Sequence, residues 1–192
     1  MPDHVSVLLA SGSPRRRELL GHLGVDFHVA SPDVDETPEP GENPASYVVR
    51  LALDKVAAVP AAHDVLVIAA DTTVDVDGVV FEKPVDLDDA RRMLAALSDR
   101  THRVHTGVAV RLGDRSAHGL VSTDVAFVPL SPAMIDWYVA TGEPMDKAGA
   151  YALQGVGAVL VAAVHGSVSN VIGLPLAELV VLAARVGRPL IP

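Results

Sequence analysis

The 192-residue chain contains no cysteine, which excludes disulfide bonds and thiolate metal sites. A chain of this length can bury a substantial core without either kind of crosslink. No uninterrupted apolar stretch approaches the roughly 18 residues that cross a bilayer, and the N-terminus lacks the pattern of a secretory signal. We therefore expect a cytoplasmic protein that binds no membrane. Because no repeat or change in composition marks a boundary, residues 1–192 are predicted to form one domain.

Positive charge is also scarce. The chain has 24 acidic residues against 15 lysines and arginines, a net charge of −9, so it is not expected to bind a nucleic acid polymer, which requires a basic face. The same balance permits a small anionic ligand in a local basic pocket. Lysine is the scarcer cation, with only Lys55, Lys83 and Lys147. Because lysine is a compact point charge that can approach a single phosphate oxygen, these three are candidates for chemistry, with chance placement as the alternative.

Several motifs of known enzyme classes are missing. The sequence contains no GxxxxGK[ST] phosphate loop, no HExxH and no GxSxG. Most of the eight histidines are expected at the surface. His102 and His105 fall on a predicted strand with their side chains on opposite faces, so they are not expected to share a metal ion.

Arginines are concentrated at the predicted start of a helix, in "LLASGSPRRRELL". Ser13 is a suitable N-cap and Pro14 suits the first helical position, which places Arg15 and Arg16 in the first turn. The helix dipole disfavours a cation there by about 0.3–1 kcal/mol, and free backbone N–H groups at this end favour an anion. The pattern therefore predicts an anionic ligand at this helix end.

The remaining periodicity predicts alternating strands and helices around one sheet. The acidic, proline-rich residues 31–44 are expected to form a surface loop. Long strands at 102–112 and 117–128 are expected to pair antiparallel across a Gly-Asp turn. Other strands are expected at 5–10, at 27–30, before and just after Asp71, and in a short return after Asp77-Gly78; helices are expected at 14–23, 45–59, 86–97, 131–140 and within 173–187.

Lys55 falls on the apolar side of the helix predicted at 45–59, whereas Arg50 and Asp54 share the opposite side. A buried, unpaired ammonium is costly, so Lys55 must either extend to the edge of the apolar face or reach an anion. Asp71 ends a hydrophobic strand, the position at which open α/β sheets bind ligands. Together with Glu36 and the other cations, this set could support a metal-assisted phosphoryl or nucleotidyl reaction, although each residue alone could be a surface charge.

In order, the motifs "LLASGSPRR", "RLALDK", "AADTTV", "FEKP", "VHTGVAV", "DKAGAYALQG" and "GSVSNVIGLPL" resemble those of the Maf family of nucleotide pyrophosphatases. The resemblance runs from about Leu8 to Leu176. It implies an α/β fold of the Maf and inosine-triphosphatase type, with an elongated mixed sheet flanked by helices and two lobes around a central cleft. It also implies hydrolysis of a nucleoside triphosphate to the monophosphate and pyrophosphate, a divalent cation, Mg²⁺ or Mn²⁺, and a homodimer.

The resemblance also implies roles for individual residues. Asp71 would accept the proton of the attacking water, and Glu36 would join Asp71 as a metal-site carboxylate. Arg16, Lys55 and Lys83 would contact phosphates.

Three positions imply the branch of the family that acts on dTTP and UTP: Arg15, Thr72 and Gln154. The branch acting on 7-methyl-GTP has an aromatic residue, a glutamine and a glutamate at these places. Ser11 and the glycine after it would let the backbone approach the phosphates closely. The anionic ligand predicted at the start of the helix would then be the triphosphate.

A second function from a different class is a non-catalytic nucleotide-binding regulator of cell division or septum formation. Such a protein would keep the cations but would need neither Asp71 nor Glu36. Because both carboxylates are present, the sequence favours the enzyme. A phosphotransferase is a third reading, but no sequence feature marks an acceptor site.

Overall fold

Seven strands form one mixed sheet in the computed structural model, which describes residues 6–192. The sheet order is β2-β1-β3-β5-β6-β7, with β4 paired to β3; β1 runs parallel to β2 and β3, and all other neighbours are antiparallel. This arrangement confirms the predicted mixed α/β sheet. The strands are β1 (Val7–Ala10), β2 (His28–Ala30), β3 (Leu66–Val76), β4 (Val79–Phe81), β5 (Thr101–Leu112), β6 (Arg115–Phe127) and β7 (Val161–His165).

Helices flank this sheet, and several begin where the sequence predicts. The side chains of Ser13, Asp86 and Ser131 each accept a hydrogen bond from the backbone N–H three residues later, as N-caps do. None of the helices within residues 6–192 has the length and apolar character needed to cross a bilayer. The helices are α1 (Pro14–Gly21), α2 (Pro44–Ala58), α3 (Leu87–Leu97), α4 (Pro132–Ala140), α5 (Val168–Ile172) and α6 (Leu176–Arg185).

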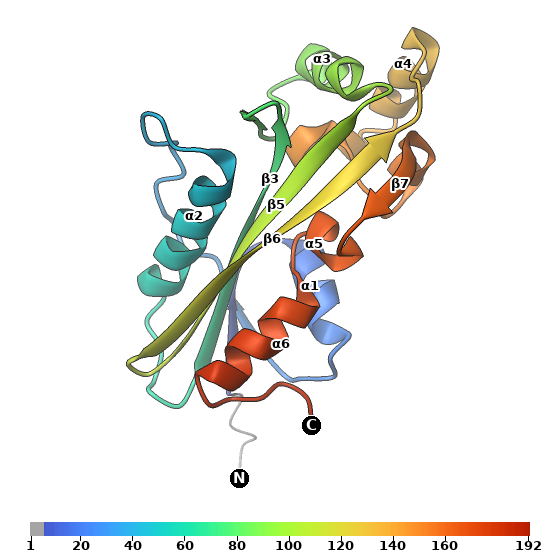
Figure 1. The fold of residues 1–192 in the computed structure, drawn as a ribbon. Coiled ribbons are helices and arrows are strands. Elements are labelled where there is room, and N and C mark those ends of the chain that lie inside the picture. The colour runs from blue at the N-terminus through green and yellow to red at the C-terminus, as the bar shows by residue number, and fades with distance from the viewer. Residues whose placement is uncertain (1–5) are drawn as a thin grey trace.

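The long strands β3, β5 and β6 run through both lobes of the molecule (Figure 1). In Figure 1, α2 covers one face of the sheet and α6 covers the other, with α1 beside α6, while α3 and α4 lie at the upper end. Separate apolar clusters hold these parts: one joins α1 and α6 to the sheet, a second joins α2 to it, and a third joins α3 and α4 to its far end. The predicted two-lobed architecture is therefore confirmed.

Strand β3 changes partners along its length. Its first residues, 66–68, pair with β1, and its last, 74–76, pair with β4 on the same side. On this side, residues 69–73 have no strand partner within residues 6–192, although β5 pairs with them on the other side. The sheet therefore opens at the middle of β3, next to Asp71.

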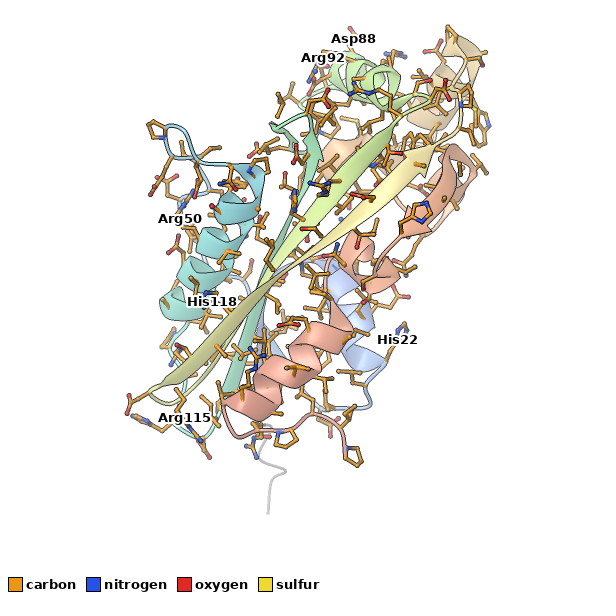
Figure 2. The ribbon with its side chains drawn as sticks, viewed as in Figure 1. His22, Arg50, Asp88, Arg92, Arg115 and His118 are labelled. Carbon is orange, nitrogen blue, oxygen red and sulfur yellow. The ribbon has the colours of Figure 1, made fainter. Side chains whose placement is uncertain are left out.

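Helix α2 packs directly on the backbone of β5. A Cβ atom placed on Gly107 would lie 2.2 Å from the Val48 carbonyl oxygen, so only glycine permits this approach. At the other end of α2, the Arg111 guanidinium donates to the carbonyl oxygen of Val59 at 2.6 Å. These two contacts hold α2 against the sheet. Arg50 lies on the outer side of α2 with Asp54, the side that the sequence predicts for both, and the two side chains form an ion pair at 3.5 Å (Figure 2).

The two strand histidines lie on opposite faces of β5, as expected. His102 is buried and contacts the Tyr151 hydroxyl, whereas His105 contacts Ser122 and Asp75 on the α2 side. The other described histidines are exposed, which confirms the surface prediction for most of them.

Some boundaries differ from the predictions. The first strand begins at Val7, and residue 5 of the predicted strand lies outside the described residues. The first helix ends at Gly21, before a turn in which Gly24 has a φ of 69°. The glycine-rich segment before β7 forms the 3-10 helices η1 (Glu143–Asp146), η2 (Ala148–Ala150) and η3 (Val156–Leu160), which the sequence did not predict.

Candidate active site

A cavity of about 890 Å³ lies at the opening beside β3. Its walls come from the end of β1, the start of α1, the middle of β3 and the segment around η2. The structure brings together every site residue that the sequence singled out: Ser11, Arg15, Arg16, Glu36, Lys55, Asp71, Thr72, Lys83 and Gln154 all line this cavity.

Lys55 joins the two predicted carboxylates. Its Nζ atom lies 2.6 Å from Asp71 Oδ1 and 2.6 Å from Glu36 Oε1. The Lys55 side chain is only 10% exposed, so the ammonium is held by these carboxylates and not by water. Of the two alternatives for Lys55, the structure shows the second, in which the ammonium reaches an anion.

Arg16 is fixed by acceptors from three segments. Its Nε atom donates to the Gly173 carbonyl oxygen at 2.8 Å, and its terminal nitrogens donate to Ser11 Oγ at 3.3 Å and Thr72 Oγ1 at 3.1 Å. Burial lowers the pKa of Arg16, against the opposing attraction of Asp71. A cation that has lost water in this way gains from a bound anion, and the first turn of α1 contains no acidic residue.

A hydrogen-bonded chain of polar residues continues from Thr72 into the core. Thr72 Oγ1 lies 2.9 Å from Thr106 Oγ1, which donates to the Asn170 carbonyl oxygen at 3.0 Å. Asn170 is fully buried, and its side-chain amide donates to the Val104 carbonyl oxygen. Sequence reasoning missed Thr106 and Asn170, because neither residue type stands out before the strands are paired.

Arg15 crosses the cavity to the opposite wall. Its Nη1 atom lies 3.2 Å from Asp146 Oδ2, and the other Asp146 oxygen binds Lys147. Burial works to raise the pKa of Asp146, but the hydrogen bond and charge of Lys147 lower it overall. Lys83 is exposed and makes no ion pair with any of residues 6–192, so its ammonium is available to a ligand.

Tyr47 and Glu82 are further wall residues that the sequence did not single out. The Tyr47 hydroxyl lies 2.9 Å from Glu82 Oε1 and 2.8 Å from the Glu36 carbonyl oxygen. Burial, with the nearby Glu82 carboxylate, raises the pKa of Tyr47, so this hydroxyl keeps its proton. The only sequence signal for Glu82 was its place beside Lys83 in "FEKP".

Asp71 and Glu36 carry the carboxylate oxygens that Mg²⁺ and Mn²⁺ prefer as ligands. Within residues 6–192 no cluster of three or more histidine and carboxylate side chains could hold a metal alone. Mg²⁺, however, is commonly held by one or two carboxylates plus phosphate oxygens of a substrate. In this structure the two carboxylates share one cation, the Lys55 ammonium, so they lie at the same place in the cavity wall.

The fold and the cavity define an α/β protein with a cationic cleft that also carries carboxylates. A family model described as Maf-like protein matches residues 6–186. The dTTP/UTP pyrophosphatase of an Anaeromyxobacter species is 57% identical over 189 residues, covering 96% of this chain and 91% of that protein. That of Myxococcus xanthus is 50% identical over 189 residues, covering 98% and 96%. The chain therefore belongs to the Maf-like family, which confirms the resemblance.

A solved structure is also similar. It is that of a nucleoside-triphosphatase / dITP/XTP pyrophosphatase from Mycobacterium abscessus, with a TM-score of 0.43 and 17% identity. The similarity covers 63% of this chain and 73% of that one.

Proposed function

We propose that this protein hydrolyses nucleoside triphosphates, with dTTP and UTP as preferred substrates, to the monophosphate and pyrophosphate. The observation that carries the proposal is the position of Asp71, a carboxylate held by Lys55 inside a cavity whose walls supply further cations. The relatives named dTTP/UTP pyrophosphatase, which match nearly the whole chain, support the same reaction.

The triphosphate would bind at the start of α1. There Arg15 and Arg16 line the cavity together with the exposed Lys83. A polyanion at this position supplies the negative charge that the first turn of α1 lacks. Binding would also give Arg15 a phosphate partner in exchange for Asp146, with which it pairs in this structure.

In the proposed reaction, a water oxygen attacks the α-phosphorus while the bond from that phosphorus to the oxygen bridging to the β-phosphate breaks. Asp71 accepts the proton of the water, and pyrophosphate leaves. Lys55 orients the Asp71 carboxylate at 2.6 Å. A Mg²⁺ or Mn²⁺ ion held by Asp71, Glu36 and substrate oxygens would neutralise phosphate charge.

Base selection would come from Gln154 and Thr72. The Gln154 side chain makes no hydrogen bond to any of residues 6–192, so its amide can offer a donor and an acceptor to a pyrimidine edge. Thr72 is fixed by Arg16 and Thr106. We further propose a cytoplasmic homodimer that binds neither a nucleic acid polymer nor a membrane, which sedimentation and co-sedimentation with DNA and vesicles would test.

The deciding experiment compares the wild-type chain with Asp71→Asn on dTTP, UTP, GTP and 7-methyl-GTP, each with Mg²⁺ or Mn²⁺. The wild type should release pyrophosphate, fastest from dTTP and UTP. Asp71→Asn should lose at least about a hundredfold in kcat, because a positioned base contributes about 10²–10⁴-fold, while calorimetric affinity for dTTP is retained. Asp124→Asn is the matched control, since Asp124 pairs with Arg103 on the surface and does not line the cavity.

Two outcomes would contradict the proposal. Release of orthophosphate and diphosphate would place the attack at the γ-phosphorus. Binding of dTTP without any turnover in the wild type would instead favour the nucleotide-binding regulator.

A further inference from the structure

The segment that carries Gln154 has no regular structure of its own. It lies between η2, which ends at Ala150, and η3, which begins at Val156. Gly155, directly after Gln154, has a φ of 88°, a conformation that favours glycine. Something outside the segment must therefore fix the direction in which the Gln154 side chain points.

A carboxylate and a phenol hold this segment on both sides of Gln154. Glu143 Oε1 accepts a hydrogen bond from the Gly157 N–H at 2.8 Å, and Glu143 Oε2 accepts one from the Val156 N–H at 3.0 Å. The Tyr138 hydroxyl donates to Glu143 Oε1 at 2.8 Å and accepts from the Ala152 N–H at 3.1 Å. We call Glu143 and Tyr138 the clamp.

The clamp is preorganised. Tyr138 is fully buried, so its ring cannot move without disturbing the core. Burial works to raise the pKa of Glu143, but the hydrogen bonds from the Gly157 N–H, the Tyr138 hydroxyl and the Val156 N–H lower it below its usual value. The carboxylate is therefore ionised at neutral pH and accepts all three bonds.

The segment that carries Gln154 also packs closely against the clamp. A Cβ atom on Gly155 would lie 2.5 Å from Glu143 Oε2, and one on Gly157 would lie 2.5 Å from the Tyr138 hydroxyl oxygen. The segment thus rests directly on the clamp, with no space between them. Glu143 and Tyr138 do not line the cavity themselves, so they act on a ligand through the residues that they hold.

We propose that Glu143, supported by Tyr138, is a positioning residue for base selection that acts through Gln154. This inference rests on the proposed function, because it names what sets the selectivity of that same site. A loosened segment should weaken recognition of the base and so raise KM, whereas Arg16, which is held by residues outside this segment, keeps its place against the phosphates.

Glu143→Gln is the test variant. Glutamine offers one acceptor oxygen and one amide nitrogen, so it would place a donor against a backbone N–H that now donates to Glu143. We expect the KM for dTTP to rise about tenfold with kcat within about threefold, and the ratio of kcat/KM between dTTP and GTP to fall by a similar factor. Tyr138→Phe, which keeps the ring, should shift both quantities in the same direction.

The decisive comparison is a double-mutant cycle with Gln154→Ala. If Glu143 acts through Gln154, adding Glu143→Gln to Gln154→Ala should leave kcat/KM for dTTP unchanged within about twofold. The inference would be overturned if Glu143→Gln lowered kcat/KM for dTTP by the same factor in the wild type and in Gln154→Ala. It would also be overturned if Glu143→Gln left the ratio of kcat/KM between dTTP and GTP unchanged. Thermal unfolding of each variant checks folding; if Glu143→Gln fails to fold, Tyr138→Phe takes its place in the cycle.

Failure of the proposed function gives a different result. If the wild type hydrolyses no nucleoside triphosphate, the same cycle is read from calorimetric affinities for dTTP and GTP. Suppose that Glu143→Gln changes the ratio of the affinities for dTTP and GTP only when Gln154 is present. Glu143 would then still position Gln154, although the protein is not an enzyme.

Discussion

At the scale of single residues, Lys55 is a tightly held charge in the cavity. Its ammonium lies 2.6 Å from each of two carboxylates and is nearly buried. Arginine has the same charge but a wider, planar head that cannot occupy this position. Lys55→Arg should therefore lower kcat/KM for dTTP at least about tenfold, with a melting temperature that changes by only a few degrees.

Lys83→Arg is the informative comparison. Lys83 is exposed, so a longer head can adjust, and we expect a smaller but measurable loss in steady-state assays. Unchanged kcat/KM in both variants would show that neither lysine acts on the substrate.

The sequence could predict residues whose chemistry conflicts with their surroundings. The arginines at the positive end of a helix predicted an anion, and Lys55 on an apolar helix face had to reach either the edge of that face or an anion. The structure places Arg15, Arg16 and Lys55 at the cavity. Thr106 and Asn170 carry no such conflict. Their contact spans 64 residues of sequence, and only the folded sheet brings them together.

At the scale of elements, the contact between α2 and β5 positions Lys55. In Gly107→Ala the new methyl group would meet the backbone of Val48, which cannot rotate away. The helix must shift, so we expect a loss of at least about 2 kcal/mol in the free energy of unfolding, measured by urea denaturation, and a reduced kcat.

Gly119→Ala is the matched control on the neighbouring strand β6. Its methyl group would meet only the end of the Glu178 side chain, at 2.7 Å, which can move aside. The free energy of unfolding should stay within about 0.5 kcal/mol of wild type. Equal losses in both variants would indicate that α2 is not held by close approach to Gly107.

Helices and strands with a clear periodicity of apolar residues or a capping residue could be predicted from the sequence, whereas the short helices could not. The caps at Ser13, Asp86 and Ser131 mark helix starts within a residue or two. In contrast, η1, η2 and α5 have five residues or fewer and are held by contacts with distant segments, such as that of the Gly149 N–H with the Glu82 carbonyl oxygen. Periodicity needs more residues than these elements contain.

At the scale of the whole molecule, His102 couples stability to pH. Burial lowers the pKa of His102 to about 4 from its usual value of 6.5. The unfolded chain therefore binds a proton near pH 6.5 that the folded chain does not bind until near pH 4, so stability falls as pH drops through this window. The largest contribution is about 3 kcal/mol.

His102→Gln removes this titration and keeps a polar group near the Tyr151 hydroxyl. Between pH 7 and pH 4.5, the wild type should lose about 2–3 kcal/mol more free energy of unfolding than His102→Gln. His22→Gln serves as the control, because His22 projects from the end of α1 into solvent (Figure 2). Parallel curves for wild type and His102→Gln would contradict the assignment.

The hydrogen bond from Arg16 to Gly173 joins residues 157 positions apart, and this has a consequence for the growing polypeptide. At about 5–20 residues per second, a ribosome makes Gly173 roughly 8–30 seconds after Arg16. Until then the Arg16 guanidinium lacks the carbonyl acceptor that orients it. The Thr106 hydroxyl likewise lacks its acceptor, the Asn170 carbonyl oxygen, until Asn170 is made. A nascent chain can therefore form α1 and pair its central strands early, yet the cleft becomes competent only when nearly all of the protein has been translated.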